Sequence, residues 1–270
     1  LQELLGQFQQ HKYDIFCSQL LLEPQANLSP KLLEDYQLDL CTDGYFVVYL
    51  LTIDDPDLFS KTYSQQQQDM FFMYLDESIK ELLATLHLRS FLVTISGSLA
   101  IVVNFEQLTT TAYQTLAKNI YETACALSKN KFTMGVSSIN KKLSNLHITY
   151  QQALTATSYQ IVYGSGIILY DNIDSQKVSD FEYPLSIEQK LLEGLRLNSA
   201  SQIQTALEDF GEYFYDNLPH EIEVIKNSYV RLLLDILQNL YKTGANTSAF
   251  EGNIHRTFAQ IHSMNTISQM

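Results

Sequence analysis

The chain lacks any apolar run of the ~18–20 residues that a membrane-spanning helix needs. Its first ten residues, LQELLGQFQQ, have neither the basic flank nor the apolar centre of a secretory signal peptide. Both absences favour a cytoplasmic protein. The chain also begins without methionine and stops without a terminating pattern, so we expect a fragment of a longer protein.

Cysteine is scarce and widely spaced. The three residues Cys17, Cys41 and Cys125 form no CxxC pair. Disulfide scaffolds and structural zinc sites both need a denser arrangement. We therefore predict reduced thiols.

Positive charge is also in deficit: 17 Lys and Arg face 30 Asp and Glu, a formal net charge of −13. Phosphate affinity comes mainly from clustered Lys and Arg, so the balance argues against direct nucleic-acid binding. Lys141 and Lys142, with Lys129 and Lys131 nearby in sequence, form the one notable basic stretch. We interpret it as solvated surface rather than a phosphate site.

The common catalytic motifs are missing. The chain contains no HExxH, no G-x-S-x-G and no Walker A sequence, and Gly164-Ser165-Gly166 precedes a predicted strand rather than a helix. The histidines are not paired at ligand spacing (His11, His87, His147, His220, His255, His262). We assign no catalytic, cofactor-binding or metal-binding residue, although serine, histidine and acid groups could still converge in space as an unrecognised enzyme.

Residues 131–171 carry the clearest pattern. A β-rich run at 132–136 is followed by a polar connection and a helix with an apolar face (Leu146, Tyr150, Ala153, Leu154, Thr157). The glycines at 164 and 166 end it, and a second β-run follows at 167–170. The segment therefore predicts a strand, a helix and a strand.

The preceding elements extend this order. We predict a strand at 45–53, a helix along Phe71 to Leu86, a hairpin of 91–95 and 99–103, and a helix at 109–127. The first six elements give the split βαβ arrangement, an antiparallel sheet with helices on one face. Strand 45–53 is apolar on both faces, so helices cover both sides, or a partner covers one. The fold class is α+β.

The two ends of the chain read as helical. Residues 1–22 place Leu1, Leu5, Phe8, Ile15 and Leu22 near heptad spacing, which fits either a packed domain helix or a signalling helix that pairs across a dimer. A short helix follows at 31–36, with Ser29 as its cap and Pro30 in its first turn. After Asp174 we predict four helices, at 185–197, 201–218, 221–241 and 249–261.

The segment 131–171 resembles the C-terminal part of the degenerate GGDEF-like domain of large bacterial AraC-type transcriptional regulators. The matching residues are Gly135-Val136-Ser137, Ser144 and Leu146, then Tyr150, Ala153 and Ala156, and finally Tyr163-Gly164 and the strand IILYD. GGDEF domains have a palm-like fold with a ferredoxin-like βαββαβ core, in agreement with the element order. The resemblance extends from about Tyr13 to the end, and it implies a DNA-binding domain just past Met270.

The resemblance also implies where catalysis would lie. An active diguanylate cyclase holds Mg²⁺ with carboxylates at the end of the first strand and in the hairpin turn. Here Thr52 stands at the first position, and the turn reads Ser96-Gly97-Ser98-Leu99-Ala100. The Arg-x-x-Asp inhibition motif is replaced by Arg89-Ser90-Phe91-Leu92. Asp54, Asp55 and Asp57 are predicted to form a solvated strand-to-helix loop, or else a residual cation site.

We accordingly divide the chain into signalling helices (1–40), a degenerate GGDEF-like domain (41–174) and a helical linker (175–270). The expected function is non-catalytic: signal transmission and dimerisation within an AraC-type regulator, with no enzyme activity and no cofactor. The expected partners are a second copy, an upstream receiver or sensor domain, and DNA through the missing domain alone. The alternative is a module that retains nucleotide or metabolite affinity in a vestigial cleft near Asp54 and Ser96.

Overall fold

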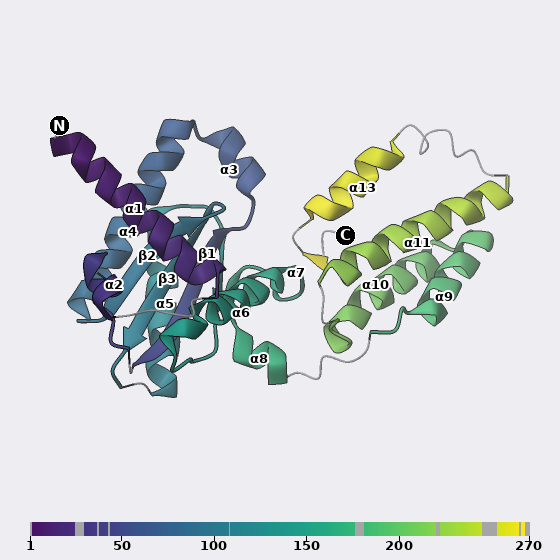
Figure 1. Cartoon of the computed structure of the whole chain (residues 1–270). Helices are drawn as coiled ribbons and strands as arrows, with labels where there is room; N and C mark the ends of the chain where they lie inside the picture. The colour runs from purple at the N-terminus through teal and green to yellow at the C-terminus, as the bar shows by residue number, and fades with distance from the viewer. Residues whose placement is uncertain are drawn as a thin grey trace. The chain divides into compact units, whose positions relative to one another are not determined.

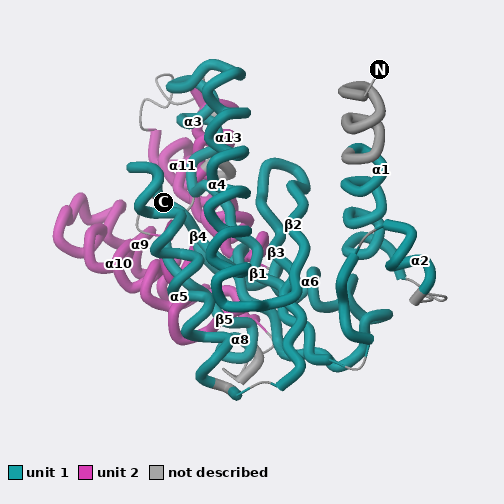
Figure 2. The backbone as a smooth tube through the Cα atoms, turned by 90° about the vertical axis from the view of Figure 1, so that its left-hand side faces the viewer, with its two compact units in different colours: residues 1–160, 165–173 teal, residues 161–164, 174–270 magenta. Residues whose placement is uncertain are grey.

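The computed structural model describes residues 2–24, 30–36, 38–42, 44–107, 109–175, 181–219, 222–244, 253–264 and 266–267. The chain forms two compact units, shown in Figure 2. The first contains Leu1–Gln160 and Ser165–Ile173, and the second contains Ile161–Gly164 and Asp174–Met270. The predicted Ser29 cap, His220 and the start of the last predicted helix (249–252) lie outside the described residues.

The first unit is built on a five-stranded sheet in the order β2-β3-β1-β4-β5. The strands are β1 (Tyr45–Ile53), β2 (Arg89–Ile95), β3 (Ser98–Phe105), β4 (Phe132–Val136) and β5 (Gly166–Leu169). The first four pair antiparallel, and β5 runs parallel to β4. The predicted split βαβ core and the α+β class are confirmed, and β5 makes the complete sheet mixed.

The helices of the βαββαβ core, α4 (Gln65–Thr85) and α5 (Thr110–Leu127), cover one face of the sheet (Figure 1). Alternate residues of β1 point toward them, namely Val47, Tyr49 and Leu51. Helix α4 starts at Ser64, whose hydroxyl and the Gln67 side chain form a reciprocal capping box. The prediction that these two helices pack on the same face of the sheet is therefore confirmed.

Helices outside that core cover the opposite face: α1 (Gln2–Leu22), α2 (Pro30–Asp35) and α6 (Leu146–Ser158). The other alternate residues of β1, Phe46, Val48 and Leu50, lie in this second core. Strand β1 is thus buried on both faces by helices of its own unit, which is the first of the two arrangements that its sequence predicts. No partner is needed to cover it.

The connection after β4 continues the sheet before α6 begins. Ser137 accepts the Val48 N–H through Oγ at 2.9 Å, and its own N–H donates to the Val48 carbonyl at 3.0 Å. Asn140 exchanges two backbone hydrogen bonds with Phe46, at 2.6 and 2.9 Å. A 3-10 turn, η1 (Leu143–Asn145), then leads into α6. The polar connection seen in the sequence is therefore anchored along β1.

Short helices were missed by the sequence reading: α3 (Pro56–Thr62), α7 (Gln160–Tyr163) and α8 (Tyr170–Ser175). Strand β5 spans Gly166–Leu169, so the predicted strand at 167–170 is shifted by one residue, and Tyr170 starts α8 instead. Helices this short carry fewer than two full turns, too few for an apolar period to stand out. Two of them directly follow strands.

The second unit is helical, as predicted. Its helices are α9 (Leu185–Arg196), α10 (Ala200–Asp216), α11 (Glu223–Lys242) and α13 (Ile254–Ser263). An aromatic cluster fills its centre (Phe181, Tyr183, Phe210, Tyr213, Phe214, Tyr229). The predicted apolar stripe of α11 is confirmed as core at Ile225 and Leu232.

Throughout the described residues, no helix combines the length and the apolar character that crossing a membrane requires.

Candidate functional site

The end of β1 and the β2–β3 turn lie at the same edge of the sheet. The register pairs Leu51 of β1 with Leu99 of β3, so the turn at Ser96 and Gly97 falls beside the last residues of β1. Both turn residues have positive φ, 50° and 81°, as a two-residue type I′ hairpin requires. The fold therefore brings together the two segments in which the resemblance places catalytic groups.

The hydroxyl and carboxylate at the end of β1 are directed toward β4. Thr52 Oγ1 donates to the Thr133 carbonyl at 3.0 Å, and Thr133 Oγ1 donates to Asp54 Oδ1 at 2.7 Å. The Asp54 N–H donates to the Lys131 carbonyl at 3.0 Å. Thr133 is fully buried, so these contacts hold the strand ends together. Asp54 thus has a structural role that the sequence did not indicate.

The other two acidic residues serve helix α3. Asp55 is its N-cap and accepts the Leu58 N–H through Oδ1 at 2.9 Å, while Pro56 occupies the first helical position. Asp57 lies in the first turn, where a carboxylate interacts favourably with the helix dipole. The predicted solvated strand-to-helix loop is therefore confirmed for Asp55, which is exposed between β1 and α3, whereas the exposed Asp57 already lies in the helix.

The residues at this edge do not fit the Mg²⁺ that the fold family implies. Mg²⁺ needs octahedral oxygen ligation with one or more carboxylates free to coordinate it. Thr52 supplies a hydroxyl that is already donated, Asp54 is bonded to Thr133, and no Asp or Glu occurs between Arg89 and Asn104. Across the part of the chain that the structure describes, no group of three His, Cys, Asp or Glu side chains could hold a metal ion.

Arg89, at the start of β2, is used in surface ion pairs. Its guanidinium lies 2.9 Å from Glu106 Oε1 and 3.3 Å from Asp39 Oδ1. Leu92, in the position where the inhibition motif has an acid, is buried in the sheet. Arg89 therefore links β2 to the segment that precedes β1.

The basic residues that sequence groups together are separated in space. Lys141 lies over the Tyr45 ring, 5.3 Å from its centroid, at the start of β1. Lys131 lies beside Asp54 just after β1 ends. A strand of nine residues divides the two, so no single basic patch forms from them.

A second polar arrangement joins α5, the β4 connection and α8. Tyr113 donates its hydroxyl to Asp171 Oδ2 at 3.3 Å, and Ser138 donates to Asp171 Oδ1. The Tyr113 carbonyl accepts the buried Tyr49 hydroxyl at 3.0 Å. Burial raises the pKa of Tyr49 and of Tyr113, and the Asp171 carboxylate raises that of Tyr113 further. Both phenols thus stay protonated and keep donating at neutral pH.

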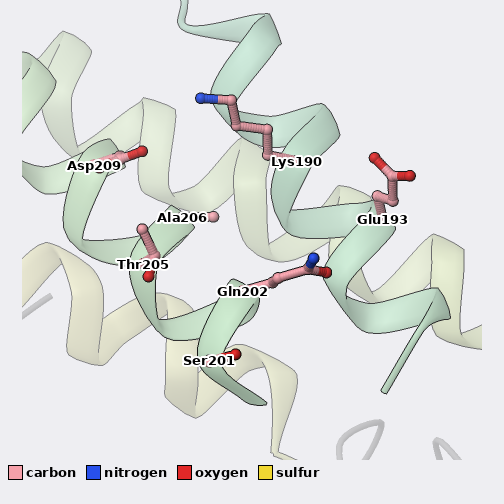
Figure 3. A pocket seen from close by; sticks show the side chains of 7 residues that line it. All are labelled: Lys190, Glu193, Ser201, Gln202, Thr205, Ala206 and Asp209. Carbon is pink, nitrogen blue, oxygen red and sulfur yellow. The ribbon is translucent and has the colours of Figure 1, made fainter. Parts of the chain in front are cut away.

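The helical unit contains a groove of about 320 Å³ between α9 and α10, shown in Figure 3. Its lining is polar and of mixed charge, with Lys190 and Glu193 from α9 and Gln202, Thr205 and Asp209 from α10. The helices approach closely at Gly194, where a Cβ would lie 3.2 Å from the Gln202 Cβ. In sequence these residues are indistinguishable from a solvated helix face, so the groove was not predicted.

The antiparallel four-stranded core with its paired helices is the architecture of a palm-like domain. Residues 36–159 match the family model described as GGDEF-like domain. A GGDEF-like domain is therefore present in this chain, from the end of α2 to the end of α6, and the GGDEF-like part of the resemblance is confirmed for that region. No curated protein matches the chain.

Proposed function

We propose that this chain is a non-catalytic region of a bacterial AraC-type transcriptional regulator that acts in the cytoplasm, transmits a signal and dimerises. The residues at the sheet edge formed by the end of β1 and the β2–β3 turn carry the proposal. Where turnover needs free carboxylates, Thr52 and a Ser96–Gly97 turn are present, and Asp54 accepts a hydrogen bond from Thr133. Without hard ligands the charge of a triphosphate and its metal is uncompensated.

The absence of turnover is tested by incubating the chain with GTP and Mg²⁺ or Mn²⁺ and separating the products chromatographically. We expect no cyclic dinucleotide above an enzyme-free blank. Asp54→Asn is the control, because it removes the carboxylate nearest to Thr52 at the end of β1. Product that forms with the parent chain and disappears with Asp54→Asn would refute the proposal.

Helix α1 supports the dimerisation part, because its two sides differ. Phe16, Cys17, Leu20 and Leu21 are buried against the sheet. Ile15 and Leu22 expose 45% and 51% of their surfaces, and at 3.6 residues per turn they lie on the opposite side. These two belong to the heptad pattern seen in the sequence. One helix can therefore pack on its own domain and still present an apolar seam to a second copy.

Analytical ultracentrifugation tests this seam with the Ile15→Lys/Leu22→Lys variant. We expect the parent chain to sediment as a dimer and the variant as a monomer. Leu58→Lys/Leu127→Lys is the matched control, because those leucines, on α3 and α5, are 60% and 42% exposed, on average no less than Ile15 and Leu22. A monomeric parent chain, or equal dissociation of both variants, would rule out the α1 seam.

The Asp171 contacts suggest how a signal would leave the domain. Asp171 lies in α8, the last element of the first unit, and is bound by Tyr113 of α5 and by Ser138. A displacement of α5 or of the β4 connection would change these bonds and bias the position of α8. The helical unit would then relay the change to a helix-turn-helix domain of the full-length protein. DNA would be contacted there, since the acidic chain itself repels phosphate.

A further inference from the structure

A groove of about 420 Å³ runs along α10 in the helical unit. Leu207 and Tyr215, two turns apart, line it and expose 44% and 46% of their surfaces. Gly211 lies midway between them. A Cβ at Gly211 would lie 3.3 Å from the Tyr229 hydroxyl and 3.4 Å from Ile267 Cγ2, so the glycine keeps this space open.

The tyrosine that reaches the groove from α11 is held in a fixed orientation. The Tyr229 ring lies edge-on to Phe210, with centroids 5.1 Å apart, and stacks on Phe214 at 5.8 Å. Burial raises the pKa of Tyr229, and the nearby Tyr215 raises it further. The phenol is therefore neutral at physiological pH and offers its hydroxyl without charge.

The rim of the groove is acidic. Glu208 and Glu212, one turn apart on α10, line it together with the two tyrosines, and none of the described side chains that line it is a Lys, Arg or His. The Gln204 amide donates to Glu208 Oε1 at 3.0 Å. Within the described ranges, no ion pair neutralises either carboxylate. The groove thus combines apolar walls, two aromatic rings and two uncompensated negative charges.

The groove between α9 and α10 provides a contrast within the same unit (Figure 3). There Lys190, Glu193 and Asp209 line the space, and none of the described lining residues is aromatic. A cation entering that groove would meet a positive charge and, among the described residues, no ring face. Of these two grooves, the one lined by Tyr215 and Tyr229 is complementary to a positively charged, partly apolar molecule.

We propose that this α10 groove binds a small organic cation, in which an ammonium group is attached to an aromatic or aliphatic body. Aromatic faces attract ammonium groups, and the attraction grows when carboxylates share the site. The groove volume falls within the ~300–1,000 Å³ typical of small-molecule sites. Anionic metabolites and nucleotides are disfavoured by Glu208 and Glu212. The α10 groove is lined by residues of the helical unit and not by those at the end of β1 or in the β2–β3 turn, and this proposal does not depend on the function proposed above.

The test uses the full 270-residue chain at about 150 mM salt, where distant charges are screened. The probe is 2-phenylethylamine, compared with neutral 2-phenylethanol and anionic phenylacetate by methyl-detected NMR titration. We expect saturable shifts at the Leu207 and Ile267 methyls, with the amine binding at least about tenfold more tightly than either analogue.

Two variants test whether the carboxylates of α10 and the Tyr215 ring contribute to amine binding. Glu208→Gln/Glu212→Gln is expected to weaken amine binding about tenfold, and Tyr215→Ala to weaken it several-fold. These side chains are exposed, so the fold should be retained, as circular dichroism can verify. Glu193→Gln/Asp209→Asn removes equal charge from the neighbouring groove and should leave binding unchanged. Absence of saturation, equal affinity for 2-phenylethanol, or equal weakening by this control would each overturn the proposal.

Discussion

Gly135, the fourth residue of β4, lies where helix α6 closely approaches the sheet, and it gives the sharpest test of the fold. A Cβ added there would clash with the Ala153 carbonyl oxygen and lie 2.8 Å from both the backbone N and Cγ2 of Thr157. Its φ is not in the left-handed region, so alanine is allowed by the backbone at this position. Gly135→Ala therefore separates packing from backbone conformation.

Side-chain packing and backbone conformation change the free energy of unfolding in opposite directions at this position. Without the helix above it, alanine in a strand interior would be about 0.5–1 kcal/mol more stable than glycine. Overpacking costs typically ~1–3 kcal/mol, and the obstacle here is helix backbone rather than a flexible side chain. Taking the upper end of the overpacking cost and subtracting the gain, we expect Gly135→Ala to lower the free energy of unfolding by ~2 kcal/mol. For a domain of this size that lowers Tm by roughly 4–8 °C.

Hydrogen exchange measured by mass spectrometry provides the assay, because it reports on each unit separately, and the chain has no tryptophan for fluorescence. Peptides from β1 and β4 should lose protection, while those from α10 and α11 should not. Thr157→Ala should rescue little, since the Ala153 carbonyl remains. Gly97→Ala is the control: no atom lies within 4 Å of its Cβ, so its cost comes from positive φ alone. A Gly135→Ala chain as stable as the parent would refute the close approach of α6.

Three further predictions follow from single contacts. Asn104 is buried, accepts the Cys41 N–H at 2.6 Å and donates to the Tyr45 carbonyl at 3.4 Å, so Asn104→Leu should cost ~1–3 kcal/mol in urea unfolding, and Asn104→Asp should also destabilise, because it replaces the amide donor by a buried carboxylate. Burial raises the pKa of Cys17 to about 12, so as pH rises the unfolded chain loses the thiol proton before the folded chain does. The free energy of unfolding should therefore fall as pH rises from about 9 to 12. Urea titrations at each pH should show a smaller fall for Cys17→Ala. Arg231 lies 3.9 Å from the buried Glu188, and because the arginine is half exposed, Arg231→Met should cost ~2 kcal/mol, less than a fully buried pair. Arg231 also lies 3.7 Å from Asp235 and over the Tyr183 ring, so adding Glu188→Gln should recover only the part of that loss due to Glu188 in a double-mutant cycle, and full additivity would contradict the pairing.

Much of the fold could be predicted because its elements carry strong periodic signals. Strand β1 was located at both ends, since nine consecutive apolar or β-branched residues are bounded by Gly44 and Asp54. The same holds for the β2–β3 hairpin, where Ser96-Gly97 interrupts two β-rich runs. The order of these elements then restricted the topology to a split βαβ sheet.

The covering of the second sheet face could not be predicted in the same way. Which side of α1 is buried depends on Phe16, Cys17, Leu20 and Leu21, and these lie outside the heptad positions that the sequence emphasised. A helix with apolar residues on two sides gives two valid patterns, and only tertiary contacts decide which one faces the sheet. The α10 groove escaped prediction for a related reason: Gly211 creates space through the absence of a side chain.

The candidate site shows that the sheet does not depend on the residues at its edge. The residues of β1 that stabilise the sheet, such as Val47, Tyr49 and Leu51, are buried, whereas Thr52 lies at the strand end. Compared with a carboxylate at this position, Thr52 avoids like-charge repulsion next to Asp54 and adds a hydrogen bond to the Thr133 carbonyl, for a gain of ~1 kcal/mol. Stability therefore slightly favours threonine over a carboxylate at this edge. The buried residues of β1 are required for the domain to fold, and the residue type at its strand end can differ without loss of the sheet.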